Sequence, residues 1–522
     1  MLKTLRILAA ISSTLAGGVF ASDDVYRYRI EIDAALSRAD VRACFADVRP
    51  RRLVSGTSGA GRYLLQATNG DGQPLSRSRD RLSLHTGADT DCIHYSIDLD
   101  AATDGDFSRS GIVRLEDAIV LPPGVWFWYP DPWPPGREIR LSFVLPSGFS
   151  VSVPWPETDG NDFRVTRTPR TWRSYSAIGR FNEHELAVPG ASLRLAVLNN
   201  GPPVDPDLVD TWLGEAATAV SGLYGRFPIE SPQIIVVPIG RGGAPVPWAH
   251  VLRGGSVNAR FFIDQRQSLS EFREDWTATH ELSHMLLPYL GRSGAWLSEG
   301  IASYYQNVLR SKAGMLDERE AWQKLHDGFR RGVRDTSGET LRETSGEMHG
   351  RGAYMRVYWS GAAIALMADV ELRRRTNGRE SLASALDKFQ RCCLPSERRW
   401  QPEEFLARLD ELTGDVVFSS TAERWLDSDE FPDVRSLYPE LGISVRFGRV
   451  RLTDDAPLAE LRAQIARSTP AILTSRTVGK VFQDSSPNDT PLSSRAVGEG
   501  SSRSRNAMTQ KEPGSAAAQA SR

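Results

Sequence analysis

The spacing of apolar residues changes along the chain, and this change constrains the fold more than any other feature of the sequence. Up to about residue 200, apolar residues recur at every second position in short runs such as 26–32 and 193–198, separated by Gly, Pro, Asp and Asn. Such alternation is typical of half-buried β-strands. From residue 205 a helical period dominates, interrupted by strand-like runs at 233–238 and 256–263. The pattern predicts an α+β multidomain protein in which a β-sandwich-like domain, residues 22–200, precedes a mostly helical part.

One segment of the first domain, residues 125–133, is rich in Trp, Tyr and Phe. Such rings either form an exposed surface for sugars or pack at the edge of the sandwich. Their position among prolines favours packing.

The two ends of the chain differ in composition from the rest. Lys3 and Arg6 precede an apolar run, residues 7–20, that is too short to span a bilayer, and small residues follow at 19 and 21. This pattern predicts a cleaved signal peptide, residues 1–21, and therefore a periplasmic or secreted protein with no membrane span in the mature chain. After a short C-terminal extension, residues 446–469, the Ser- and Arg-rich stretch 470–522 is expected to be disordered.

Charge and cysteine content narrow the possible partners. The chain has 63 Lys and Arg against 65 Asp and Glu, a net charge of −2, so a nucleic-acid partner is not expected. In an exported chain Cys44 and Cys92 are expected to form a disulfide. Cys392 and Cys393 are adjacent and are expected to be free thiols, or one of them to pair elsewhere. A thiolate metal site is disfavoured because no CxxC spacing occurs.

The strongest chemical signal is the segment His280-Glu281-Leu282-Ser283-His284. Residues four apart share one face of a helix, so both imidazoles can bind one Zn²⁺ while Glu281 lies beside the metal-bound water. The capping pair Ser268 and Glu271 is expected to start this helix, which would extend to about residue 290.

A catalytic zinc site needs a third protein ligand and an open position. Glu299, on the next predicted helix, is the candidate, because the Gly-rich turn 291–294 can reverse the chain and return it towards His280 and His284. The alternative is that Glu299 is a first-turn glutamate favoured by the helix dipole.

These residues resemble the gluzincin metallopeptidases, whose HExxH helix is followed by a W-L-x-E-G-x-A-x-Y-type segment. The chain has Trp296-Leu297-Ser298-Glu299-Gly300-Ile301-Ala302-Ser303-Tyr304 at this place, and it looks closest to the glycyl aminopeptidase-like branch. The likeness covers about residues 204–441 and includes softer segments at 223–228, 310–314 and 358–361.

The resemblance implies a thermolysin-like zinc peptidase domain with a helical subdomain, residues 204–445. It implies Zn²⁺ bound by His280, His284 and Glu299, with Glu281 as general base. It also places Tyr358 where the family has a tyrosine that donates a hydrogen bond to the oxyanion of the tetrahedral intermediate. The expected function is that of an exported zinc metallopeptidase, such as an aminopeptidase, acting on peptides or proteins; no oligomeric state is indicated.

The chain departs from this group of aminopeptidases in the segment 242–250. It has Ala249 where they carry a glutamate that holds the free α-amino group of the substrate, and it retains His250. An endopeptidase or amidase on the same zinc site is therefore an alternative. An inactive zinc-bearing binding protein is a second one, although a structural site would need neither Glu281 nor Tyr358. The candidate edge strand for an extended peptide is 256–263.

Overall fold

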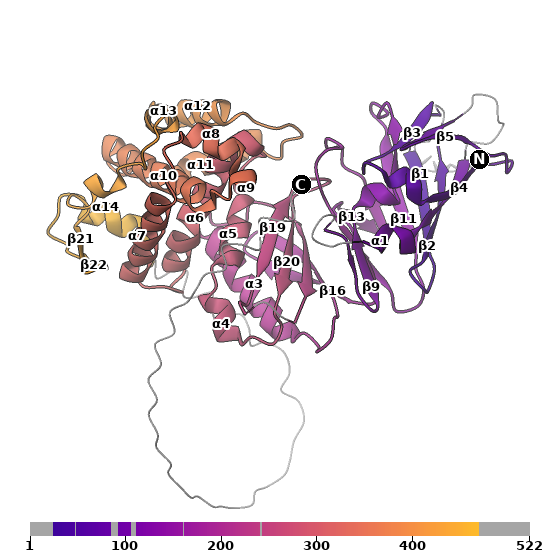
Figure 1. Ribbon diagram of the computed structural model, residues 1–522, viewed down its shortest axis with the longest axis horizontal. Coiled ribbons are helices and arrows are strands. Elements are labelled where there is room, and N and C mark those ends of the chain that lie inside the picture. Colours follow the sequence, from indigo (N-terminus) through magenta and orange to yellow (C-terminus); the bar gives the residue numbers. More distant parts are fainter. Residues whose placement is uncertain are drawn as a thin grey trace, which may run out of the picture.

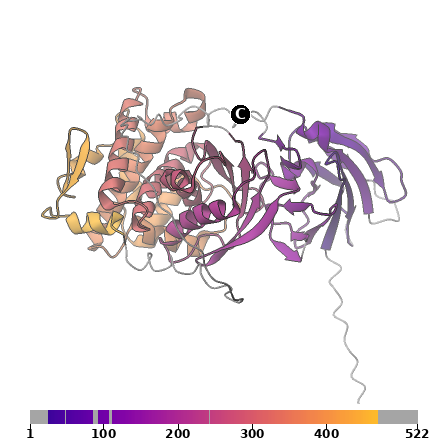
Figure 2. The ribbon, with the colours of Figure 1, turned by 90° about the horizontal axis from the view of Figure 1, so that it is seen from below.

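The computed structural model describes residues 25–46, 49–84, 92–105, 111–159, 161–240 and 243–468. The predicted signal peptide, residues 1–21, and the predicted tail, residues 470–522, lie outside the described residues. Figure 1 shows three parts in a row, with N-terminal β-sheets at one end, a central sheet with its helices, and a helical part at the other end. The perpendicular view in Figure 2 shows the same order, which confirms the predicted α+β multidomain class.

The N-terminal part is built from three sheets. The first has seven strands, in the order β13 (Glu157–Asp159), β14 (Asp162–Arg164), β11 (Glu138–Val144), β1 (Val25–Ile32), β2 (Arg38–Cys44), β7 (Cys92–Asp98) and β4 (Leu64–Asn69). The second has the order β10 (Trp128–Asp131), β3 (Arg52–Ser55), β6 (Arg81–Ser83) and β5 (Ser76–Ser78). The third has the order β12 (Ser150–Ser152), β15 (Ser176–Gly179), β9 (Ala118–Leu121) and β8 (Val113–Arg114), and a short helix α1 (Leu99–Thr103) follows β7.

The aromatic segment of this part lies in the core between the sheets. The side chains of Trp126, Phe127 and Trp128 are fully buried, and the Trp126 and Phe127 rings make edge contacts with the ring of Trp155. The predicted packing is therefore confirmed, since large apolar rings are stabilised most when they are removed from water.

The disulfide expected between Cys44 and Cys92 is present, because the antiparallel register of β2 and β7 puts the two residues opposite each other. The expectation for the other two cysteines is wrong: Cys392 and Cys393 are bonded to each other. Consecutive side chains in a helix interior diverge by about 100°. Cys393, however, is the last residue of its helix, and the backbone at Leu394 is already extended. The chain can therefore bring the two sulfurs together.

The central sheet has five strands, in the order β16 (Asn182–Val188), β17 (Ala191–Val197), β18 (Gln233–Pro238), β20 (Asn258–Ile263) and β19 (Trp248–Leu252). Strands β17, β18 and β20 are parallel, whereas β16 and β19 are antiparallel to their neighbours. Because β16 and β17 belong to this sheet, the first domain ends near residue 180 and not at 200 as predicted. Alternation marks a strand but does not tell which sheet the strand joins.

The predicted edge strand 256–263 is also wrong. It corresponds to β20, which is paired on both sides, with β18 and with β19. The outer strand is β19, whose sequence does not alternate clearly. The antiparallel return of the chain from β19 to β20 puts β19 outermost.

The helices are α3 (Pro206–Ser221), α4 (Leu269–Glu274), α5 (Thr277–His284), α6 (Ala295–Lys312), α7 (Glu318–Arg334), α8 (Leu341–Gly346), α9 (Met348–Arg351), α10 (Tyr354–Thr376), α11 (Leu382–Cys393), α12 (Pro402–Thr413), α13 (Phe418–Leu426) and α14 (Ala459–Ala466). None of the described helices is both long and apolar enough to cross a membrane.

The motif helix is shorter than predicted. The capping box of Ser268 and Glu271 starts α4, which ends at Glu274, and the HExxH residues lie on a separate helix, α5. Asp275 causes the break: its backbone is extended and its carboxylate accepts a hydrogen bond of 2.7 Å from the Thr277 N–H. A side chain that satisfies a first-turn N–H begins a new helix.

The segment predicted as a short extension, residues 446–469, is instead part of the helical region as far as it is described, up to residue 468. Strand β22 (Arg449–Leu452) pairs with β21 (Ile443–Arg446), and helix α14 follows β22 in the chain. Arg462 of α14 is buried and its guanidinium lies 2.8 Å from the Glu318 carboxylate of α7.

Helices α6 and α10 cross at two glycines, Gly300 and Gly361. A Cβ atom at either glycine would collide with backbone atoms of the opposite helix. The two helix backbones can approach this closely only because neither residue has a side chain. Glu299 and Tyr358 flank this crossing, so the crossing sets the distance between them.

We predict that Gly361→Ala lowers the free energy of unfolding by about 1–3 kcal/mol, because the added methyl group forces the helices apart. Urea unfolding followed by circular dichroism measures this change. Gly214→Ala is the matched control, because a Cβ there meets only a Leu186 methyl group at 3.7 Å and alanine favours the helix. Equal unfolding midpoints for the wild type and the Gly361 variant would contradict the packing argument.

Candidate metal centre and active site

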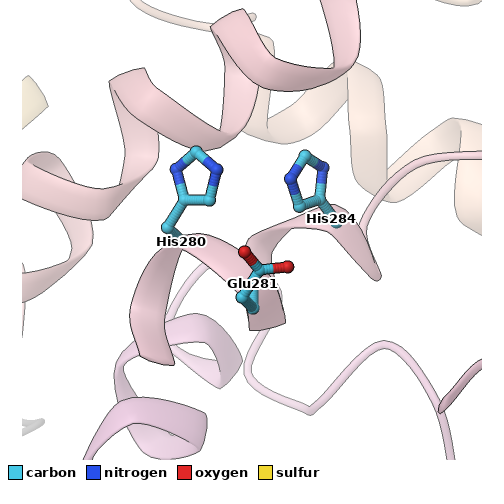
Figure 3. Close-up of side chains that lie close together, drawn as sticks. All are labelled: His280, Glu281 and His284. Carbon is cyan, nitrogen blue, oxygen red and sulfur yellow. The ribbon is translucent and has the colours of Figure 1, made fainter. Parts of the chain in front are cut away.

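Helix α5 presents two imidazoles and a carboxylate at one place. The rings of His280 and His284 have centroids 4.9 Å apart, and Figure 3 shows them on one side of the helix with the Glu281 carboxylate between them in this view. One ligand atom from each of the three residues lies within 4.8 Å of the others. All three residues are buried, so donors of metal-binding type converge where little water competes.

Glu299 of α6 completes the set. Its Oε2 atom lies 3.2 Å from Nε2 of His280 and 3.4 Å from Nε2 of His284. Ligand atoms bound at about 2.1 Å around a tetrahedral ion are about 3.4 Å apart, so Glu299 lies at the separation from each histidine that Zn²⁺ requires. The structure thus brings the three predicted ligands together, and the donor set fits the metal.

The second nitrogen of each ring is held by a residue of α6. Nδ1 of His280 lies 2.8 Å from Oε1 of Gln306, and Nδ1 of His284 lies 3.1 Å from Oγ of Ser298. These contacts orient the rings so that both Nε2 atoms face Glu299. The sequence analysis missed Gln306. The sequence could have indicated it, because Gln306 is seven residues after Glu299 and both therefore lie on one face of α6.

The charges of the cluster compensate one another. Burial acts to raise the pKa of Glu299, but the two histidines outweigh it and lower the pKa well below its usual range. Burial acts to lower the pKa of His280, yet Glu299 and Glu281 raise it. The pKa of Glu281 is raised, chiefly by burial, with His284 and His280 opposing. Glu281 is therefore a stronger proton acceptor than an exposed glutamate.

Tyr358 reaches the centre from α10. Its ring is nearly parallel to that of His280, at 12° and a centroid distance of 5.8 Å, and its hydroxyl hydrogen bonds to Glu299. Burial, together with Glu299 and Glu281, raises the pKa of the phenol well above its usual value. Tyr358 therefore stays protonated at neutral pH and can donate a hydrogen bond.

The edge strand β19 lies beside α5. The guanidinium of Arg253, just after β19, donates a hydrogen bond of 2.7 Å to the His284 carbonyl at the end of α5. The Val251 backbone hydrogen bonds to Glu281. One of the two outer strands of the sheet thus lies next to the proposed catalytic residues.

Two cavities open at the centre. The β19 cavity, of about 250 Å³, is lined by Gly111, Arg173, Tyr175, Trp248, Ala249, His250, Leu252, Arg260, Glu281, His284, Glu299, His349, Tyr354 and Tyr358. The α9 cavity, of about 1150 Å³, includes Arg253, Tyr289, Arg292 and residues 345–351 in its wall. Arg173, Leu252, His284, Glu299 and His349 line both cavities, so the two cavities meet at the centre. The place of His349 at the centre was not predicted from the sequence.

No protein-family model and no curated protein sequence matches the chain. Among solved structures, it is similar to an aminopeptidase N family protein from Idiomarina loihiensis, with a TM-score of 0.62 and 15% identity over 81% of this chain and 79% of that chain. It is also similar to an M1 zinc metallopeptidase from Deinococcus radiodurans, with a TM-score of 0.47 and 14% identity over 78% of this chain and 95% of that chain. The first likeness shows that the chain has the fold of an aminopeptidase N family protein. The resemblance inferred from the sequence is thus confirmed for the fold.

We predict that Gln306→Leu weakens zinc binding about 10- to 100-fold, because the lost acceptor no longer orients His280. Competition with a chelator measures the affinity. Gln306→Glu keeps an acceptor and should bind zinc normally, whereas His284→Ala removes a ligand and should lose the metal on dialysis. Wild-type affinity in the leucine variant would show that Gln306 does not position the ligand.

Proposed function

We propose that the protein is an exported zinc-dependent peptidase that does not require a free amino terminus in its substrate. The observation that carries the proposal is the position of Glu299: one of its oxygens lies at 3.2 and 3.4 Å from the two Nε2 atoms, while Glu281 and Tyr358 lie beside it. A purely structural zinc site would need neither of these two residues, which argues against an inactive binding protein.

The residues of the centre divide the reaction between them. His280, His284 and Glu299 would hold Zn²⁺, which when bound supplies a Lewis acid for a peptide carbonyl and lowers the pKa of water. Glu281 accepts a proton from the attacking water and returns it to the leaving amine, a role that its raised pKa supports. The Tyr358 hydroxyl donates a hydrogen bond to the oxyanion that develops on the carbonyl.

The arrangement of the sheet suits an extended peptide. Strand β19 pairs with β20 along one edge, and its other edge is the outer edge of the sheet. A peptide that adds to this edge by backbone hydrogen bonds would pass Glu281 and the metal ligands. Both cavities adjoin the centre, so there is room for peptide residues beside the bond that is cut.

The proposed tolerance of a blocked amino terminus rests on charge. Ala249 lines the β19 cavity in place of a carboxylate, and among the described residues only Glu281 and Glu299 line this cavity with carboxylates. Both act at the metal centre in the proposed mechanism. An α-ammonium group has no further carboxylate in this cavity with which to form a charge-assisted hydrogen bond.

Two features support the proposal that the protein is exported. The sequence of residues 1–21 has the pattern of a cleaved signal. All four cysteines are in disulfides, which persist in oxidising compartments such as the periplasm or the outside of the cell.

We predict that Glu281→Gln retains zinc but lowers kcat about 10²- to 10⁴-fold, because an amide cannot accept the proton. Tyr358→Phe should lower kcat about 10²-fold with little change in KM, since the lost donor acts mainly in the transition state. Steady-state kinetics on an internally quenched peptide, with zinc determined in parallel, measures both. Tyr438→Phe is the matched control, because it removes a hydroxyl group that hydrogen bonds to His326 and lies outside both cavities. Normal turnover in the Glu281 variant would exclude its role as base.

We also predict that one peptide is cleaved at similar rates with a free and with an acetylated amino terminus. The reason is the absence of a further carboxylate in the β19 cavity. Mass spectrometry of the products from both forms makes the comparison and identifies the bond that is cut. A strong preference for the free amine would show an aminopeptidase and would contradict this part of the proposal.

A further inference from the structure

The β19 cavity has an unusual balance of charge for a site with a metal and a carboxylate base. Its two carboxylates, Glu281 and Glu299, belong to the centre itself. The rest of its wall contains the guanidinium groups of Arg173 and Arg260 and the imidazoles of His250 and His349. The charge of this part of the wall comes from the two guanidinium groups, so the cavity is cationic away from the centre.

Arg260 is the most unusual of these residues. It belongs to β20, it is 1% exposed, and no carboxylate among the described residues offsets its charge. Its guanidinium donates a hydrogen bond of 2.6 Å to the Gly111 carbonyl and stacks on the ring of Tyr175 at 3.7 Å. Its Nε atom has no acceptor within the described part of the chain. Burial lowers its pKa only to about 10, so Arg260 remains charged at neutral pH.

His250 adds a second buried nitrogen without a partner. It is opposite Arg260 in the register of β19 and β20, so the two side chains lie on the same face of the sheet. Its Nε2 atom has no hydrogen-bond partner among the described residues. Burial and the positive charges of Arg260 and Arg173 lower its pKa well below the usual value, so the ring is neutral. A neutral imidazole can donate a hydrogen bond to an anion.

A buried cation that lacks a counter-charge is costly, and a bound anion would offset this cost. We propose that the β19 cavity binds a carboxylate of the peptide substrate, with Arg260 and Arg173 as the residues that determine this specificity. The inference rests on the proposed peptidase function for the nature of the substrate. The carboxylate is either the side chain of Asp or Glu near the cleaved bond or the terminal α-carboxylate of the peptide.

A competing explanation is that Arg260 only joins the two domains through Gly111 and Tyr175. In that case Arg260 would affect stability but not the choice of substrate. Arg173 separates the two explanations, because its side chain is exposed at the cavity and does not contribute to the buried contact.

The test is a set of acetylated, internally quenched hexapeptides in which one Glu is moved through every position, with Gln as the matched residue. Each peptide is made with a free and with an amidated carboxyl terminus. For the zinc-loaded full-length protein we expect kcat/KM to be about tenfold higher for Glu than for Gln at one position, or for the free over the amidated terminus. The position identifies the source of the carboxylate. Equal values throughout would overturn the inference.

Variants test whether residues of the β19 cavity cause the preference for a carboxylate. Arg260→Gln and Arg173→Gln should each reduce the preference towards unity, whereas Arg260→Lys should retain part of it. Arg292→Gln removes an exposed arginine from the wall of the α9 cavity and should keep the preference. Thermal unfolding and zinc content identify any variant that fails to fold, and Arg173→Gln then decides. A preference that survives Arg173→Gln but is lost with Arg292→Gln would overturn the proposal.

Binding separates this inference from the peptidase proposal. The Glu281→Gln protein, loaded with zinc, is titrated with the same Glu and Gln peptides in a fluorescence assay. Tighter binding of the Glu peptide supports the carboxylate site even if the wild type cleaves nothing, a result that would reject only the peptidase function. Cleavage by the wild type without any preference for the acid, together with equal binding, would reject the carboxylate site alone.

Discussion

The active-site geometry depends on the close crossing of α6 and α10 at Gly300 and Gly361. Glu299 directly precedes one glycine, and Tyr358 lies about one turn before the other. Because no side chain separates the two backbones at this point, the carboxylate and the phenol meet above the imidazoles of α5. Gln306, two turns further along α6, then holds His280. One helix thus supplies a metal ligand, the residue that orients another ligand, and the surface against which α10 packs.

The electrostatics of the centre and of its surroundings are complementary. At the centre, two carboxylates and two imidazoles offset one another, so their burial is tolerable and the set can accept a divalent cation. Next to it, Arg260 is buried without a carboxylate partner among the described residues, and Arg173 adds a second positive charge. A peptide drawn through this region would meet a metal with a base on one side and a cationic wall on the other. Such an arrangement can orient a substrate as well as cleave it.

The N-terminal part contributes directly to this wall. Gly111, Arg173 and Tyr175 come from it, and they face strands of the central sheet. Further contacts join the two parts, including the hydrogen bond of 3.1 Å between Gln233 and Ser152 and that of 3.2 Å from Arg194 to the Val153 carbonyl. The β-rich part is therefore a structural component of the β19 cavity. Its aromatic segment, by contrast, is buried in its own core.

Some features of this protein follow from local sequence alone. Residues four apart share a helix face, so His280 and His284 had to point the same way. Glu299 was identified because a two-histidine helix lacks one ligand that the next helix can supply. The alternation of apolar residues was sufficient to predict an N-terminal β-rich part, and the change to a helical period at residue 205 predicted the start of α3. Each of these inferences concerns neighbours along one element, whose relative directions are set by the period of the backbone.

Other features were decided only by the tertiary structure. Periodicity could not show that β16 and β17 extend the central sheet, or that β19 and not β20 is the outer strand, because pairing depends on how the chain returns. The side chain of Asp275 divided one expected helix into two. Cys392 and Cys393 can form a disulfide because α11 ends at Cys393 and the backbone is extended at the next residue. Arg260 became part of the β19 cavity because the fold packs β20 against the loop at Gly111, which is 149 residues earlier in the chain. Contacts between distant segments depend on the packing of whole elements, and no local pattern encodes them.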